Sequence, residues 1–242
     1  MSADARILIV NADDFGLSVG VNAGIATAHE RGVVTSASLM VWGAAVHEAA
    51  EWAADHPALS LGLHLDLAEW VYDADDGWRT RYERVPAHSS DAVAEEVRAQ
   101  VERFELLTGG LPTHLDSHQH VHRSEPAAAI VAALAGELDV PLREHNDAVR
   151  YSGAFYGQDG RGYPCREWIT ADALVSVVRA LAPGVTELGC HPGLDPGLDS
   201  VYRDERAIEV AALCDPVVRA ALDAEGVRLS SFHNVAHLEV RP

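Results

Sequence analysis

Short apolar runs alternate with amphipathic stretches along most of the chain. The apolar runs are rich in Val, Ile and Leu and predict strands, whereas stretches with apolar residues three or four positions apart predict helices. We expect strands at residues 6–12, 34–41, 59–67, 113–118, about 141–144, 186–191 and 227–232. We expect helices at residues 19–31, 43–55, 91–107, 125–138 and 171–181, with two further helical stretches before the last strand.

This alternation predicts an α/β fold in which helices cover a parallel sheet. No linker rich in Gly, Ser or Pro interrupts it, so residues 1–242 are expected to form a single domain. The number of strand–helix units favours a (β/α) barrel over an open sheet, although periodicity alone does not decide closure. In both architectures the functional groups belong at the C-terminal ends of the strands.

The formal net charge of −19 argues against a nucleic-acid partner, because no basic stripe is present to displace counterions. The chain has no lysine, and all 18 cationic side chains are arginine. This composition fits a high-salt cytoplasm or a GC-rich genome equally well. No apolar run approaches the roughly 20 residues of a membrane span. The run at 7–10 is too short for a signal peptide, so we expect a cytoplasmic protein that does not bind membranes.

The three cysteines, Cys165, Cys190 and Cys214, are odd in number and show no paired spacing. This pattern predicts reduced thiols rather than a disulfide framework or a cysteine zinc site. Cys190 precedes His191 and could be a nucleophile, but a buried cysteine in a strand is the better interpretation.

Residues 114–122 read His-Leu-Asp-Ser-His-Gln-His-Val-His, so histidine or aspartate stands at every even position. In an extended strand these side chains would share one face. At roughly 3.3 Å per residue, His114 and His122 would lie about 26 Å apart and could not bind the same ion. At most one or two of these histidines can be metal ligands, and the remaining ligands must come from elsewhere in the chain.

Other predicted strands also end in aspartate or histidine. Asp13 and Asp14 follow the first strand, His64 lies in the third, and the sixth runs into His191. Each has an ordinary explanation alone: an aspartate can cap the next helix, His64 can be a hydrogen-bonded core residue, and His191 can belong to a turn. The same coincidence at four strand ends favours a shared site.

Two histidines and one carboxylate make a plausible three-ligand site with open positions for water, as catalytic metals have. A remaining aspartate and histidine would then fit the roles of general base and general acid. The sequence therefore predicts metal-assisted hydrolysis of an acyl bond. Two rival functions stay open: a phosphoesterase with two metals about 4 Å apart, and a metal-bearing sugar-binding protein without catalysis.

An ordered set of motifs resembles the YdjC-like carbohydrate deacetylases, a family that includes the chitooligosaccharide deacetylases. The motifs are Asn-Ala-Asp-Asp-Phe-Gly-Leu-Ser (11–18), Gly-Val-Val-Thr-Ser (32–36), Gly-Leu-His-Leu (62–65), Thr-His-Leu-Asp-Ser-His-Gln-His-Val-His (113–122), Ala-Phe-Tyr-Gly (154–157) and Cys-His-Pro-Gly (190–193). The resemblance implies a TIM-like, somewhat irregular (β/α) barrel. It also implies a metal-dependent hydrolase that removes acetyl groups from N-acetylated sugars.

By this resemblance, Asp14, His64 and His118 occupy the positions of the metal ligands, Asp13 that of the catalytic base and His191 that of a catalytic acid. The resemblance implies one Mg²⁺, while two imidazoles and a carboxylate suit Zn²⁺, Co²⁺ or Mn²⁺ at least as well.

The remaining polar residues are expected to support this site. Asp116 is expected to orient a nearby imidazole, and His120 to do the same or to face the substrate. His114 and His122 are expected to be structural. Arg143, at the end of the fifth predicted strand, would either hold a polar group of the substrate or form a buried salt bridge.

The chain departs from its relatives after Gly62-Leu-His-Leu, where it continues Asp-Leu-Ala-Glu-Trp-Val-Tyr (66–72). Two long loops carry aromatic residues that either form walls of a sugar cleft or pack on the barrel or a partner subunit. These residues are Trp70, Tyr72, Trp78 and Tyr82, and Phe155, Tyr156, Tyr163 and Trp168. The expected partner is an acetylated sugar, and a homodimer is possible.

Overall fold

The computed structural model describes residues 4–145 and 148–237. Its main sheet is parallel, with the strand order β6-β3-β2-β1-β8-β7 and with β9 paired to β1. The strands are β1 (Arg6–Phe15), β2 (Ser36–Leu39), β3 (Ser60–Leu65), β6 (Leu115–Ser117), β7 (Val149–Ser152), β8 (Gly184–Cys190) and β9 (Val227–Leu229). The predicted α/β fold with a parallel sheet is confirmed.

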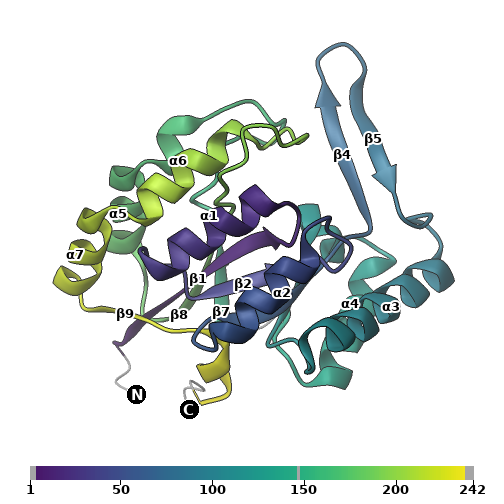
Figure 1. Cartoon of the computed structure of the whole chain (residues 1–242), viewed down its shortest axis with the longest axis horizontal. Coiled ribbons are helices and arrows are strands. Elements are labelled where there is room, and N and C mark those ends of the chain that lie inside the picture. Colours follow the sequence, from purple (N-terminus) through teal and green to yellow (C-terminus); the bar gives the residue numbers. More distant parts are fainter. Residues whose placement is uncertain (1–3, 146–147, 238–242) are drawn as a thin grey trace.

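Helices cover the outer side of this sheet. In Figure 1, α1 and α2 lie over the central strands, α5, α6 and α7 gather on one side of them, and α3 and α4 on the other. The helices are α1 (Val19–Glu30), α2 (Val46–Asp55), α3 (Ser90–Thr108), α4 (Ala127–Leu138), α5 (Ala171–Ala180), α6 (Asp204–Leu213) and α7 (Pro216–Ala224). Within the described part of the chain, no helix combines the length and the apolar character that a membrane crossing requires.

The sheet curls into a half-barrel and does not close fully. Its end strands, β6 and β7, do not pair with each other in the described residues. Residues 141–144 were expected to form a strand, but they contribute only an isolated parallel bridge between Leu142 and Leu115. The TIM-like barrel is therefore matched only coarsely, because the short segment around Leu142 cannot supply a full strand at this edge.

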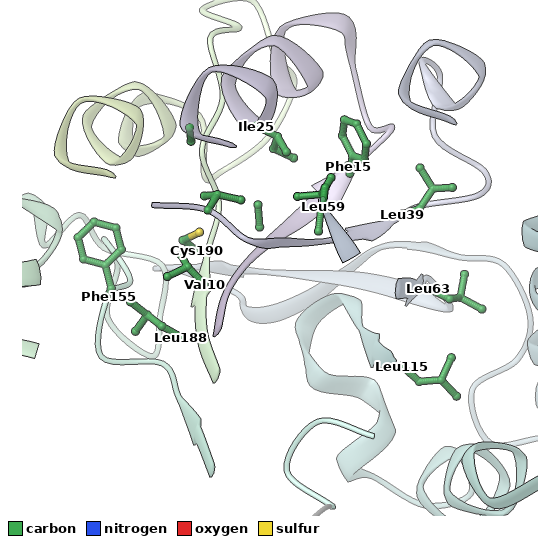
Figure 2. Close-up of a cluster of buried hydrophobic side chains, with 14 of the residues drawn as sticks. Val10, Phe15, Ile25, Leu39, Leu59, Leu63, Leu115, Phe155, Leu188 and Cys190 are labelled. Atoms are coloured by element: carbon green, nitrogen blue, oxygen red, sulfur yellow. The ribbon is translucent and has the colours of Figure 1, made fainter. Parts of the chain in front are cut away.

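The two faces of each strand carry different residues. Leu8, Val10 and Ala12 of β1 belong to the large core that packs against the helices, and Figure 2 shows Val10 in this cluster with Leu188 and Cys190 of β8. The alternate residues Ile7 and Ile9 belong to a smaller apolar cluster with Val149, Val185, Phe232 and Val235. Further along this second, inner face, the residues become polar, since a side-chain period of two places Asn11 and Asp13 there.

Three local structures were not expected from the sequence. The loop predicted to follow β3 contains an antiparallel hairpin, β4 (Ala68–Asp73) and β5 (Gly77–Glu83), which projects from the body of the molecule in Figure 1. Strand β7 lies in a region expected to be loop. The histidine run is extended only to Ser117, because His118–Arg123 forms the 3-10 helix η1.

Candidate metal and acid–base site

Asp13 and Asp14 both face one pocket although they are neighbours in the chain. Successive side chains of a regular strand point to opposite faces. Here the register of β1 shifts between Ala12 and Phe15, and Asp14 adopts a left-handed backbone conformation with φ of 66°. Aspartate tolerates this conformation better than most residues. The irregular end of β1 therefore delivers two carboxylates to the same cavity.

Asp14 lies in a compact cluster with His64 of β3 and His118, the first residue of η1. Its Oδ1 atom is 3.3 Å from Nε2 of His64 and 3.3 Å from Nδ1 of His118. Two atoms that bind one ion at about 2.1 Å, at tetrahedral or octahedral angles, lie roughly 3.0–3.4 Å apart. The buried Oδ1 atom accepts no hydrogen bond from any described residue. The spacing, the orphaned oxygen and the donor set all fit one divalent cation.

The orientation of His64 is set by Asp116. These two residues are partners in the parallel register of β3 and β6, and Nδ1 of His64 lies 2.7 Å from Oδ1 of Asp116. The hydroxyl of Ser38 donates to Oδ2 of Asp116 at 2.6 Å. A proton on Nδ1 of His64, held by this carboxylate, leaves Nε2 free to act as a ligand. The contact expected between Asp116 and a nearby imidazole is thus present.

Asp13 lies in a buried ion-pair network around Arg143. The guanidinium donates to both oxygens of Asp13 at 2.7 Å each. It also lies 2.7 Å from Asp116 and 2.7 Å from Glu187. The sequence left open whether Arg143 holds substrate or forms a buried salt bridge. The salt bridge is observed, and the side chain is not among the described residues that line the pocket.

This network shifts the protonation of its members. Burial alone would raise the pKa of Asp13, but the Arg143 guanidinium outweighs it and holds that pKa below its usual value. Burial likewise opposes ionisation of Asp14, and Arg206 with the two histidines holds its pKa well below normal. For Glu187, burial dominates and raises the pKa to about 7 despite Arg143. Both pocket aspartates are therefore ionised near neutral pH.

His191 lies beside Asp13 and lines the same pocket. Its Nε2 atom is 3.7 Å from Oδ2 of Asp13, and its backbone N–H donates to Glu209. The rings of Tyr156 and Tyr202 flank it with centroid distances of 5.2 and 5.3 Å. Burial lowers the pKa of His191 to about 4, so the ring is neutral at pH 7.

Arg206 is a member of the site that the sequence analysis missed. It projects from α6, and its Nη2 atom lies 2.5 Å from Oδ2 of Asp14, on the other carboxylate oxygen from the histidines. The side chain is almost fully buried. A signal was available, because Arg206 and Glu209 are charged residues one turn apart on a helix that also carries apolar residues. The partner of Arg206, however, is Asp14 at the end of β1, 192 residues earlier in the chain.

The pocket has a volume of about 330 Å³. It brings together most of the residues singled out by sequence, namely Asp13, Asp14, His64, His118, His120 and His191. Asp116 and Arg143 lie behind this lining and contact it. His114 is buried, with its ring stacked on Phe232 at a centroid distance of 3.8 Å. Gly62 makes room for that ring, since a Cβ atom there would lie 2.3 Å from it.

A second pocket of about 770 Å³ adjoins the first. Trp70, Tyr72 and Trp78 of the β4–β5 hairpin line it, facing residues 158–162. The two pockets share Gln119, His120, Arg123, Tyr156 and Val201. The aromatic residues of the two loops therefore divide: Phe155 is fully buried in the core, whereas Trp70, Tyr72 and Trp78 line a cavity.

All three cysteines are free, as predicted. Cys190 is buried, and its thiol donates to the backbone oxygen of Asn11 at 3.3 Å. Burial raises the pKa of Cys190 well above normal, which disfavours the thiolate that a nucleophile needs. Its proximity to His191 in the chain therefore reflects packing.

Comparison with known proteins gives consistent matches over nearly the whole chain. The family model described as YdjC-like protein matches residues 7–224. A carbohydrate deacetylase of Geobacillus stearothermophilus is 36% identical, with 94% of this chain and 97% of the relative covered. A chitooligosaccharide deacetylase of Klebsiella pneumoniae (strain 342) is 33% identical, with 95% of this chain and 99% of the relative covered.

Two solved structures share the fold. One, provisionally described as a cellobiose-phosphate cleavage protein of Enterococcus faecalis V583, has a TM-score of 0.75 and 24% identity, covering 96% of this chain and 99% of that one. The other is the Bc1960 peptidoglycan N-acetylglucosamine deacetylase, with a TM-score of 0.60 and 11% identity over 99% of this chain and 92% of that one.

Proposed function

The chain belongs to the YdjC-like protein family, and from that premise we propose that it is a metal-dependent deacetylase acting on N-acetylated carbohydrates. The relatives named above support a deacetylase. The observation that carries the proposal is the ionised, arginine-held Asp13 next to the Asp14–His64–His118 cluster in one pocket. This arrangement combines a cation site with an acid–base group, which a binding protein would not need.

Asp14, His64 and His118 would hold the ion. A divalent cation at such a site polarises a carbonyl group and lowers the pKa of water, which is the chemistry that amide hydrolysis needs. The family resemblance implies Mg²⁺, whereas two imidazoles and one carboxylate suit Zn²⁺, Co²⁺ or Mn²⁺ at least as well.

Asp13 is proposed as the general base. Arg143 holds both of its oxygens, so the carboxylate has a fixed orientation and stays ionised. The lowered pKa makes Asp13 a weaker base, but it keeps the carboxylate ionised and therefore able to accept a proton at neutral pH. Buried as it is, it would accept the proton of the attacking water without first shedding a hydration shell.

His191 is proposed as the general acid that protonates the departing amine. An amide nitrogen leaves poorly unless it is protonated, so the reaction needs such a group. The Nε2 atom lies 3.7 Å from Oδ2 of Asp13, close enough for a proton that Asp13 takes from water to pass to His191. Its neutral ring must gain a proton during the cycle, and Asp13 is the nearest group that would release one.

The second pocket points to an oligosaccharide substrate. Its aromatic side chains, Trp70, Tyr72 and Trp78, offer flat faces of the kind that stack on sugar rings. Since it opens into the first pocket, a second sugar unit bound there would place its neighbour's acetamide near Asp13. We therefore propose an acetylated substrate of at least two sugar units, hydrolysed at the unit that enters the first pocket.

Acetate release from N-acetylglucosamine monomers and oligomers tests this proposal, with O-acetylated xylan as a comparison substrate. The metal-stripped protein is assayed after separate addition of Mg²⁺, Zn²⁺, Co²⁺ and Mn²⁺. Release from oligomers that depends on added metal supports the proposal. No release from any acetylated sugar would refute it, and turnover of a generic phosphate ester instead would favour a phosphoesterase. The cytoplasmic location and a homodimer remain predictions.

A further inference from the structure

A second cluster of metal-ligating side chains lies beside the first. A ring nitrogen each of His120 and His122 and a carboxylate oxygen of Glu144 lie within 4.8 Å of one another. His120 and His122 belong to η1, and Glu144 follows the bridge that Leu142 makes with β6. None of these three residues contributes an atom to the Asp14–His64–His118 cluster.

The ring of His122 has an unexplained polar atom. Its Nδ1 atom lies 2.6 Å from the hydroxyl of Ser117, so that nitrogen is satisfied. Its Nε2 atom is buried, in a residue only 5% exposed, and has no hydrogen-bond partner among residues 4–145 and 148–237. A buried polar nitrogen in a native structure is normally paired with the protein, an ordered water or an ion, so this nitrogen is open to a metal ion.

We propose that His120, His122 and Glu144 form a second site for a divalent transition metal of the zinc class. Nδ1 of His120 is 3.1 Å from Oε2 of Glu144, which is the separation of two ligands on one ion. A hydrogen bond between those two atoms would account for their distance, but it would leave Nε2 of His122 unexplained. Two imidazoles and one carboxylate form a donor set typical of zinc, with a position left for water or a substrate hydroxyl.

The second site lies at the open edge of the sheet, where a bound ion would cross-link two segments. An ion there would join η1, which follows β6, to the segment around Leu142, where full strand pairing is absent in the described chain. His120 lines both pockets, so the ion would also fix a wall of the sugar-binding region. The second site is independent of the proposed function, because deacetylation as proposed uses only the ion held by Asp14, His64 and His118.

Metal counting tests the proposal. The chelator-stripped protein is dialysed against micromolar Zn²⁺ or Co²⁺, and bound metal is measured by elemental mass spectrometry. We expect two ions per chain in the wild type, one in Glu144→Gln and one in His120→Asn. His118→Asn should also bind one, and the double variant His118→Asn/Glu144→Gln none. Zinc should raise the melting temperature of His118→Asn but not that of the double variant.

A matched control checks for adventitious binding by surface histidines. His56 lies near His29 and Glu30, but its Nδ1 and that of His29 already contact backbone oxygens. His56→Asn should therefore keep two ions. A wild type with a single ion that His118→Asn removes, or two ions retained in both Glu144→Gln and His120→Asn, would overturn the second site. Neither of these metal-counting results would test deacetylation. If the protein bound two ions but released no acetate, the proposed function would be wrong and the second site would stand.

Discussion

The first pocket and the second pocket are built in opposite ways, and we call the base of the first pocket the floor and the hairpin side of the second pocket the wall. The floor consists of buried charges at the ends of parallel strands, where Asp13 and Asp14 are paired with Arg143 and Arg206. The wall is the β4–β5 hairpin, in which each strand pairs only with the other and Trp78 is 59% exposed. The residues proposed to carry out the chemistry are each held by several partners. The residues proposed to select the substrate lie on a hairpin whose outer end is exposed.

This contrast has an energetic basis. Removing one partner from a buried ion pair leaves an uncompensated charge, at a cost of about 3–5 kcal/mol. Truncating a half-exposed aromatic side chain on a hairpin costs mainly its own contacts. The floor should therefore tolerate little substitution and the wall much more.

Removal of the metal should have the largest effect. Treatment with a chelator followed by dialysis is expected to reduce acetate release to the uncatalysed background, because Asp14, His64 and His118 offer no other way to polarise an acetyl group. Single-metal add-back, followed by acetate detection, should restore activity and rank the ions. Full turnover by protein shown to be metal-free would remove the ion from the mechanism.

Asp13→Asn should lower kcat by about 10²- to 10⁴-fold, the range for loss of a general base. The amide keeps the shape of the side chain but cannot accept a proton, so metal content should stay at the wild-type value. Steady-state kinetics and elemental analysis of the same preparation measure both. Asp215→Asn is a matched control, because Asp215 caps α7 and asparagine caps equally well. Wild-type turnover in Asp13→Asn would exclude Asp13 as the base.

Arg143→Met should lower the free energy of unfolding by about 3–5 kcal/mol, because three buried carboxylates lose their shared cation. Urea denaturation measures this change. Glu187→Gln is the control: burial already raises the pKa of Glu187 to about 7, so replacing it with a neutral amide should cost less. If the two variants were equally destabilised, the guanidinium would not be the centre of the network.

Trp70→Ala and Trp78→Ala should have the smallest effect on the protein. Each should lower kcat/KM for an oligosaccharide about two- to tenfold, since an aromatic contact contributes about 0.5–1.5 kcal/mol. Trp78→Ala should leave the unfolding free energy nearly unchanged, whereas Trp70→Ala also removes a side chain that packs against the core. Trp168→Ala is the control, because Trp168 has a similar exposure of 46% and lines neither pocket. Equal losses of kcat/KM in all three variants would show that the hairpin has no specific role in substrate binding.

Several features could be predicted from the chain because they depend on local rules. His114 and Asp116 share a face, as the period of a strand requires, and His64 lies beside Asp116 in parallel register. The residues at the strand ends meet in one pocket because parallel strands deliver their C-terminal ends to the same side.

Other features could not be predicted, because they depend on contacts between distant segments. The backbone turns after Ser117, where Gln119 and His120 adopt left-handed conformations, and this turn separates His118 from His120 and His122. No periodicity signals such a turn. Arg206 reaches Asp14 from α6, 192 residues further along the chain, and only packing shows this contact.

The amino-acid pattern was therefore sufficient for most of the alternation of strands and helices, although not for the β4–β5 hairpin or β7, and for the identity of the residues that carry charge at the strand ends. Both follow from interactions between near neighbours and from the hydrophobic effect acting on regular periods. The folded structure established how far the barrel closes, which ring nitrogen of His122 has no partner among the described residues, and that Arg143 and Arg206 hold the two aspartates. These depend on the positions of a few atoms from remote segments, which are set by packing after the elements have formed.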